Sequence, residues 1–368
     1  EGKISKPLGL VTYTIGKAGL SPLSDMKRIL DEISDEVYLI ITKDKEINDL
    51  KIDSFAEIEH EGGGNPLMRV LNIFITQIRI SLAISRLKNV DTLFFFMGGE
   101  TLILPMLMSK LLNKKVYLAL AASQENMSNI NKDFFRFFNF LCRLNFYFAD
   151  KIIVYSKNLV KEWDLARYED KISIASQHII DDKKFYKSKE INQRDNIIGY
   201  VGRLSPEKGV LNLVKAIPSI IDEREDLKFM VIGEGKLRPE IEKYIEDNQL
   251  DESLQLKGWV SHDKLGEYLN DFKVLILPSY TEGLPGVILE AMACGTPVLS
   301  TAVGSVPDII EDQTNGFLLE DNSISNIEKG VIKVLDYPEL NRISQNGLET
   351  TKSYTLQEVV VKYKNILQ

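Results

Sequence analysis

Short apolar runs closed by glycine alternate with amphipathic stretches through the second half of this 368-residue chain. Residues 197–202 and 228–233 are two such runs, and residues 208–224 between them have helical periodicity. The same alternation continues through apolar runs at residues 254–259, 274–277 and 297–300. A regular alternation of strands and helices predicts a parallel sheet that is covered by helices on both faces.

The first half repeats this pattern less regularly. Its expected strands are residues 8–14, 37–42, 92–96, 115–120 and 151–155. A chain of this length suits two domains, and the polar stretch 187–196 is typical of a linker. We therefore expect an α/β protein with two Rossmann-like, doubly wound parallel-sheet domains facing a cleft. The expected ranges are 1–190 for the N-terminal domain and 191–354 for the C-terminal domain, with a helix at 355–368 that packs back on the first.

Composition and charge narrow the classes of function. Apolar residues make up 44% of the chain and charged residues 27%, which is the balance of a soluble globular protein. Cys142 and Cys294 are too few and too far apart for a disulfide framework or a metal knuckle, which favours a reducing cytoplasm. The net charge of −8 argues against general nucleic-acid binding.

Charge is distributed unevenly along the chain. Residues 65–151 hold 11 basic and 5 acidic side chains and are rich in Phe, Leu and Ile. This combination predicts peripheral contact with an anionic membrane, and so a cytoplasmic protein at the inner face of the cell membrane. Within the segment, residues 134–141 are strongly aromatic and form either a core helix or a lipid-facing helix. Residues 93–112 are interrupted by glycines and charged residues and are not expected to span a membrane.

A loop that enters a helix carries the strongest site candidates. Glu282 and Glu290 stand eight residues apart, and the loop between them supplies Gly283, Leu284, Pro285, Gly286 and Val287. The free N–H groups and positive dipole end of a helix N-terminus suit phosphate, and carboxylates accept hydrogen bonds from hydroxyls. Glu282 follows the expected strand 274–277, where ligands bind in such sheets. The alternative is that both glutamates are solvated helix-face residues.

A second candidate loop follows the first strand of the second domain. Arg203 and Lys208 lie here beside the glycine turn at Gly202. Arg and Lys can hold a diphosphate and neutralise the charge that grows on it as a glycosidic bond breaks. Such a site needs no metal ion. The alternative is a capped helix start with solvated charges.

Together these motifs resemble retaining glycosyltransferase family 4, a GT-B family of the glycosyl transferases group 1. The resemblance covers residues 197–320. It is carried, in order, by Gly202-Arg203 with Glu207-Lys208-Gly209, Gly233-Glu234-Gly235, Gly258-Trp259-Val260, the two glutamates, Gly304 with Asp308, and Asn315-Gly316. In the first half, residues 149–156 look like the family's strand before its last acceptor-domain helix.

The resemblance implies a retaining, metal-independent hexosyltransferase without a cofactor. It would move a hexose from a nucleotide diphosphate sugar, with UDP preferred, to a glycan or lipid-linked acceptor. Catalytic roles fall to Glu282, Arg203 and Lys208, because the two cations bind the diphosphate and Glu282 holds the donor sugar with the backbone that follows it. Donor-binding roles fall to Glu290 at the ribose and to Gly202, Gly233, Val260, Gly283, Leu284, Pro285, Gly286 and Val287.

The acceptor side matches less well. Family members often have a histidine after the strand at 115–120, where this chain has Ala-Ala-Ser-Gln-Glu at 121–125. Candidates on the acceptor side are Gly16, Lys17 and Ser123, although a glycine turn with a solvated lysine would also explain the first two. His178 is expected to be a local loop residue. Two other functions stay open: a GT-B sugar-nucleotide epimerase, and a catalytically silent sugar-nucleotide-binding scaffold subunit.

Overall fold

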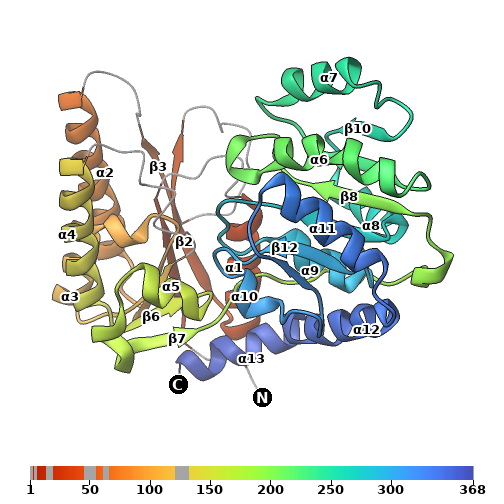
Figure 1. Ribbon diagram of the computed structural model, residues 1–368. Coiled ribbons are helices and arrows are strands. Elements are labelled where there is room, and N and C mark those ends of the chain that lie inside the picture. Colours follow the sequence, from red (N-terminus) through yellow and green to blue (C-terminus); the bar gives the residue numbers. More distant parts are fainter. Residues whose placement is uncertain are drawn as a thin grey trace. The chain divides into compact units, whose positions relative to one another are not determined.

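The computed structural model describes residues 3, 6–13, 20–44, 55–60, 66–120 and 132–367. Only the backbone is described for residues 20, 21, 43, 44, 66, 67 and 132–138. The chain divides into two compact units, which are unit 1 (Glu1–His178 with Val359–Gln368) and unit 2 (Ile179–Glu358). Each unit holds one parallel sheet with helices packed on it, which confirms the predicted fold class (Figure 1).

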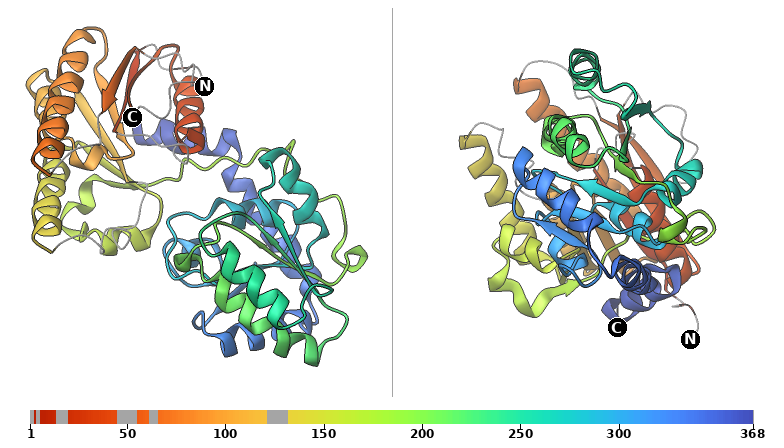
Figure 2. Two further views of the ribbon diagram at one scale, coloured as in Figure 1. Left: turned by 90° about the horizontal axis from the view of Figure 1, so that it is seen from above. Right: turned by 45° about the vertical axis from the view of Figure 1, so that its right-hand side comes forward.

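Unit 1 contains a seven-stranded sheet in the order β3-β2-β1-β4-β5-β6-β7. Its strands are β1 (Leu8–Thr12), β2 (Val37–Asp44), β3 (Ala56–His60), β4 (Thr92–Phe96), β5 (Lys115–Leu120), β6 (Lys151–Val154) and β7 (Ile172–Ile174). Its helices are α1 (Leu20–Ile33), α2 (Pro66–Arg86), α3 (Ile103–Leu111), α4 (Lys132–Phe148), α5 (Lys157–Glu162) and most of α13 (Leu356–Leu367). Figure 2 shows α2, α3 and α4 on one face of this sheet and α1 and α13 on the other.

Unit 2 contains a six-stranded sheet in the order β10-β9-β8-β11-β12-β13. Its strands are β8 (Ile197–Val201), β9 (Lys228–Ile232), β10 (Leu254–Gly258), β11 (Val274–Leu277), β12 (Val298–Thr301) and β13 (Phe317–Leu319). Its helices are α6 (Val210–Glu223), α7 (Arg238–Asp247), α8 (His262–Asp271), α9 (Gly286–Ala293), α10 (Val306–Ile309), α11 (Ile324–Leu335) and α12 (Leu340–Thr351).

Burial explains which strands the sequence revealed. All four residues of β11, Val274–Leu277, are buried because helices cover both faces, so the strand is a continuous apolar run. The edge strand β3 instead alternates exposed glutamates with a buried isoleucine and histidine. The sequence did not reveal β3, nor the three-residue strands β7 and β13, because short or edge strands lack a long apolar run.

The observed division lies between His178 and Ile179, earlier than the expected boundary at 190/191. Residues 187–196, expected to be a linker, are anchored to unit 2. Arg194 is 5% exposed and donates hydrogen bonds to several acceptors of that unit, including the backbone carbonyls of Phe272 and Cys294 at 3.0 and 2.6 Å. Polarity suggested a linker here, but the buried guanidinium of Arg194 anchors the segment to unit 2. At the other end, Val359–Gln368 group with unit 1.

Candidate functional site

Most of the donor-site residues expected from the sequence leave the central strands of unit 2. β8 lies between β9 and β11, so the chain continues to one side of the sheet after β8 and to the other side after β11. Open parallel sheets bind ligands at the carboxyl ends of their strands, at such a switch point. Gly202, Arg203 and Lys208 follow β8, and Glu282 follows β11. The topology therefore brings these two loops to one place.

An ion pair joins the two loops. Lys208 Nζ lies 2.7 Å from Glu282 Oε2, and Ser279 Oγ donates to Glu282 Oε1 at 2.6 Å. The Glu282 side chain is only 7% exposed, and that of Lys208 is 20% exposed. Both oxygens of a largely buried carboxylate are therefore satisfied, and the carboxylate is held in a fixed position beside a cation.

The loop after β12 fixes the backbone at Glu282. Ser305 donates its backbone N–H to the carbonyl of Gly283 at 3.1 Å, and its hydroxyl donates to the same oxygen. Gly304 has φ +57°, and a Cβ there would lie 1.8 Å from the carbonyl oxygen of Glu282. Only glycine permits this close approach, so the third loop supports the first two.

The loop after β8 is held from both ends. The hydroxyl of Tyr200, a buried residue of β8, donates to the carbonyl of Arg203 at 2.9 Å, and burial raises the pKa of that hydroxyl. The backbone N–H of Tyr280, in the loop after β11, donates to the carbonyl of Glu207 at 2.9 Å. These bonds organise the loop before any ligand arrives.

Arg203 occupies a different part of the site from Lys208. Its side chain is 73% exposed, and its ion pair is with Glu207 at 3.3 Å. Ser205 donates a hydrogen bond to the Glu207 carboxylate, and this bond, with help from Arg203, holds the pKa of Glu207 below its ordinary value. The guanidinium is thus solvent-facing at the edge of the site, where a diphosphate could reach it.

Glu290 lies one turn inside α9, whose first turn contains Gly286 and Val287. The side chain of Glu290 is 9% exposed, and its Oε1 lies 2.8 Å from Nε2 of His262. The His262 ring packs edge-on against Phe185 with centroids 4.9 Å apart. The hydrogen bond to Glu290 raises the pKa of His262 above its ordinary value.

The sequence analysis did not identify His262 as a site residue. The sequence signal that could have identified His262 is its position, two residues after the expected base contact Val260 and at the start of α8. Hydrogen bonds also link the carboxyl ends of β8, β9 and β10. Gly202 N–H donates to Ile232 O at 3.0 Å, and Gly233 N–H donates to Gly258 O at 2.8 Å. Gly202, Gly233 and Val260 therefore follow neighbouring strands along the same edge.

The acceptor-side candidates Gly16, Lys17 and Ser123 lie outside the described residues. Unit 1 has its own switch point between β1 and β4. Glu100 follows β4 there and is half-buried, and burial raises the pKa of its carboxyl group. The sequence analysis treated Glu100 only as an interruption of an apolar stretch. In the part of the chain that the structure describes, no group of three or more His, Cys, Asp or Glu side chains could hold a metal ion.

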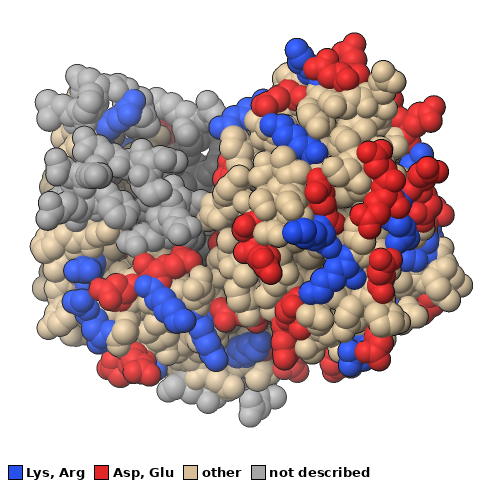
Figure 3. Space-filling view, viewed as in Figure 1, with Lys and Arg blue, Asp and Glu red and all other residues tan. Residues whose placement is uncertain are grey.

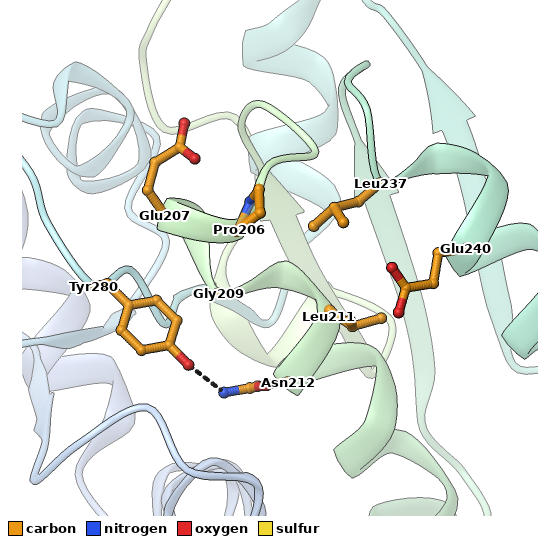
Figure 4. A pocket seen from close by; sticks show the side chains of 8 residues that line it. All are labelled: Pro206, Glu207, Gly209, Leu211, Asn212, Leu237, Glu240 and Tyr280. Atoms are coloured by element: carbon orange, nitrogen blue, oxygen red, sulfur yellow. Dashed lines mark hydrogen bonds between the residues drawn. The ribbon is translucent and has the colours of Figure 1, made fainter. Parts of the chain in front are cut away.

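A surface cavity of about 540 Å³ lies beside the loop after β8 (Figure 4). It is lined by Pro206, Glu207, Gly209, Leu211, Asn212, Leu237, Glu240 and Tyr280. The Asn212 amide donates to the Tyr280 hydroxyl at 3.1 Å on one side of it. The charged candidates Arg203, Lys208, Glu282 and Glu290 are not among its lining residues, but Glu207 and Tyr280, which join the two loops, are.

Residues 181–350 match the family model "Glycosyl transferases group 1". All four charged candidates lie inside this group 1 region. Solved structures support the fold: Anabaena HepE in complex with UDP has a TM-score of 0.76 at 15% identity, covering 98% of this chain and 99% of that one. A glycosyltransferase from Rickettsia africae has a TM-score of 0.74 at 19% identity, covering 99% and 100%.

Curated relatives extend the similarity beyond the fold. An uncharacterized glycosyltransferase of Methanocaldococcus jannaschii is 30% identical over 222 residues, covering 60% of each chain. The 2-deoxystreptamine glucosyltransferase of Streptomyces kanamyceticus is 32% identical over 142 residues, covering 39% of this chain and 37% of the relative. Both alignments span less than two thirds of the relative's own length. Part of the chain is therefore similar to group 1 glycosyltransferases, and the solved structures share its fold of two parallel-sheet α/β domains.

Proposed function

We propose that this chain is a retaining, metal-independent hexosyltransferase that moves a hexose from a nucleotide diphosphate sugar to a glycan or lipid-linked acceptor. One observation carries the proposal: the Lys208–Glu282 ion pair, supported by Ser279, sits at the switch point of a sheet inside the group 1 region. A largely buried carboxylate beside a cation suits a ligand that carries both hydroxyls and phosphate.

UDP is the carrier that we favour. Structures of HepE in complex with UDP and of Staphylococcus aureus TarM in complex with UDP belong to the same fold. The poly(ribitol-phosphate) α-N-acetylglucosaminyltransferase of Staphylococcus aureus, 26% identical over 189 residues, acts on a polymeric acceptor by its name. These facts concern those proteins, and they motivate the choice of nucleotide and of acceptor class here.

In the proposed reaction the bond between the anomeric carbon and the diphosphate oxygen breaks, and its electron pair leaves with the diphosphate. Lys208 and Arg203 offset the negative charge that grows on this leaving group, so their ammonium and guanidinium groups take the place of a metal ion. The acceptor hydroxyl attacks the face that the leaving group vacates, and its proton passes to the departing phosphate. Glu282 holds the hexose hydroxyls, and Glu290 holds the ribose.

The proposed location is the cytoplasm, at the inner face of the cell membrane. There the segment 65–151 would contact anionic lipid, and the enzyme would meet lipid-linked acceptors. The net positive charge of this segment supports the proposal.

A thermal-shift screen of UDP, GDP, ADP and their hexose conjugates, run with a chelator, tests the donor site. A ligand present at 100 times its Kd stabilises the native state by about 2.7 kcal/mol. We expect a selective shift with UDP and a UDP-hexose that Arg203→Ala reduces and the distant surface variant Arg342→Ala does not. A chain that responds to none of the nucleotides would overturn the proposal.

The stereochemistry and the competing functions have their own readouts. With an acceptor that the enzyme uses, NMR of the product should show the same anomeric configuration as in the donor. A product with the inverted configuration would overturn the retaining mechanism. Conversion of the donor to an epimer without acceptor would indicate the epimerase instead. Nucleotide binding without turnover for any acceptor would favour the silent scaffold subunit.

A further inference from the structure

The α2 helix presents an apolar surface on the outside of unit 1. At least 37% of each of seven large apolar side chains is exposed along it: Met68, Val70, Leu71, Phe74, Ile75, Ile78 and Leu82. Among the described residues, 12 of the 19 exposed large hydrophobic side chains lie on α2, α3 or α4 or directly after α3. Figure 3 shows, by contrast, acidic and basic side chains interspersed over the visible face of unit 2. Concentrated apolar exposure marks an interaction site, whereas scattered exposure does not.

Helical spacing divides α2 into two apolar strips. Ile80 and Ile84 are fully buried against unit 1. The outer strip recurs at spacings of three, four and seven residues and consists of Leu71, Phe74, Ile75, Ile78 and Leu82. A helix that is apolar on both sides and packed on one side leaves the other without an apolar partner.

The segment Met68–Arg86 is long and apolar enough to cross a membrane by length and composition alone. Its inner strip is bonded to unit 1, however. Gln77 Oε1 accepts a hydrogen bond from the backbone N–H of Leu104 at 3.1 Å, and Thr76 Oγ1 lies 3.1 Å from Nδ1 of the buried His60. These contacts indicate that α2 stays packed on the unit and offers only its outer strip.

The charged residues of α2 indicate which kind of partner suits the outer strip. Arg69, Arg79 and Arg86 are the charged residues of α2, which has no acidic residue. In the described structure none of these three arginines is recorded in an ion pair. Arg79 and Arg86 are seven residues apart and lie on one flank of the outer strip, where both line a groove of about 450 Å³ between α2 and β3. Unpaired cations beside an apolar strip complement a surface that is apolar inside and anionic at its rim.

We propose that α2 docks in the plane of an anionic lipid bilayer. The outer strip enters the boundary between headgroups and acyl chains, and Arg79 and Arg86 lie at the level of the phosphates. This assignment deepens the membrane contact of the proposed function and rests on it. A second copy of the chain would bring its own arginines together with its own Glu57 and Glu59, and it is an alternative outcome of the test below.

Two carboxylates lower the net positive charge on this flank of α2. Glu57 and Glu59 of β3 line the same groove as Arg79 and Arg86. Their charge opposes an anionic surface, so removing one of them should strengthen docking while removing an arginine should weaken it. Opposite responses from neighbouring residues of one groove give a readout that loss of folding cannot imitate.

Co-sedimentation of the full chain with lipid vesicles tests this assignment. One set of vesicles is pure phosphatidylcholine, and the other contains about 30% phosphatidylglycerol as the anionic lipid. We expect binding to the mixed vesicles, which added salt weakens, and little binding to pure phosphatidylcholine. Each arginine near the surface contributes about fivefold in affinity, so Arg79→Gln with Arg86→Gln should weaken binding about 25-fold. Phe74→Ser with Leu82→Ser should weaken it by at least about tenfold, and Glu59→Gln should tighten it.

The matched control combines Ile324→Ser with Arg342→Gln, an exposed apolar and a basic residue of unit 2, and should bind like the parent chain. Melting temperatures check that all variants fold. If the double serine variant does not fold, the arginine and Glu59 variants still test the assignment. Unchanged vesicle binding in both double variants would overturn the assignment. A dimer in light scattering that the serine variant dissociates, without vesicle binding, would assign the strip to a second copy.

The same preparation separates this inference from the proposed function. Failure to bind vesicles together with a normal UDP thermal shift would overturn only the docking surface. Vesicle binding without any nucleotide shift would leave the docking surface standing and would overturn the transferase proposal.

Discussion

At Glu290 a carboxylate assigned to the donor ribose is already paired with a histidine. The 2.8 Å contact between Nε2 of His262 and Oε1 leaves the second carboxylate oxygen to accept a ribose hydroxyl. Phe185 supports the imidazole ring from the side, and Lys184 and Asp263 add opposing charges nearby. His262 is thus placed to fix the orientation of the Glu290 carboxylate.

The pair makes stability depend on pH in a defined direction. The pKa of His262 is raised above its ordinary value of 6.5, chiefly by the hydrogen bond to Glu290. The stabilisation is therefore complete below pH 6.5 and is lost as the pH rises through the higher folded-state pKa. We expect the difference in melting temperature between the parent chain and His262→Gln to be larger at acidic than at alkaline pH. A difference that is constant with pH, or that survives in a Glu290→Gln background, would contradict this.

At the scale of elements, loops after three strands of unit 2 support one another. The loop after β12 holds the carbonyl of Gly283, and the loop after β11 holds the carbonyl of Glu207. Gly209, at φ +64°, brings the start of α6 close to the loop after β11, where a Cβ on Gly209 would lie 1.9 Å from the carbonyl oxygen of Pro278. The position of Glu282 is therefore a property of the set of loops and not of its own segment.

Gly304→Ala tests this support, and Gly258→Ala is its matched control. Both glycines have positive φ, so both variants incur the left-handed strain of about 1–2 kcal/mol. A Cβ at Gly304 also meets the backbone of Glu282, whereas one at Gly258 meets only the tips of the Glu234 and Arg238 side chains. We expect Gly304→Ala to destabilise unit 2 by about 1–3 kcal/mol more than the control and to weaken UDP binding. Chemical denaturation and thermal shift measure both effects, and equal losses in the two variants would contradict the interpretation.

At the scale of the whole molecule, the boundary of unit 2 decides which fragment can fold. Residues 179–196 place Ile180, Phe185 and Ile191 in the core of this unit and bury Arg194 among its carbonyls. We expect a fragment of residues 179–358 to melt cooperatively and to keep the UDP shift. A fragment that begins at residue 197 lacks these contacts and should be less stable by at least about 3 kcal/mol, since each deleted core side chain costs 2–5 kcal/mol. Equal melting temperatures for the two fragments would show that the boundary between His178 and Ile179 is wrong.

Much of unit 2 could be predicted from the sequence because its signals are local. The run Val274–Leu277 is apolar since both faces of β11 are covered, and glycines at positions such as 209 and 304 mark backbone that no other residue tolerates. The order of motifs then indicated a resemblance to group 1 glycosyltransferases, and residues 181–350 match the model of that family. Unit 1 was harder to predict, because β3 is an edge strand with alternating polarity. Its candidates Gly16, Lys17 and Ser123 lie outside the described residues and stay predictions.

The sequence alone determined the alternation of strands and helices, hence a parallel α/β fold, and it marked the cations and carboxylates that follow the central strands. Tertiary structure decided the pairings: Lys208 with Glu282 across 74 positions, and His262 with Glu290 across 28. It also showed that residues 187–196 belong to unit 2, where Arg194 is buried, and that the apolar helix α2 is covered on one side only. Hydrophobic periodicity is a property of neighbours along the chain, whereas these pairings depend on which strands the fold places side by side.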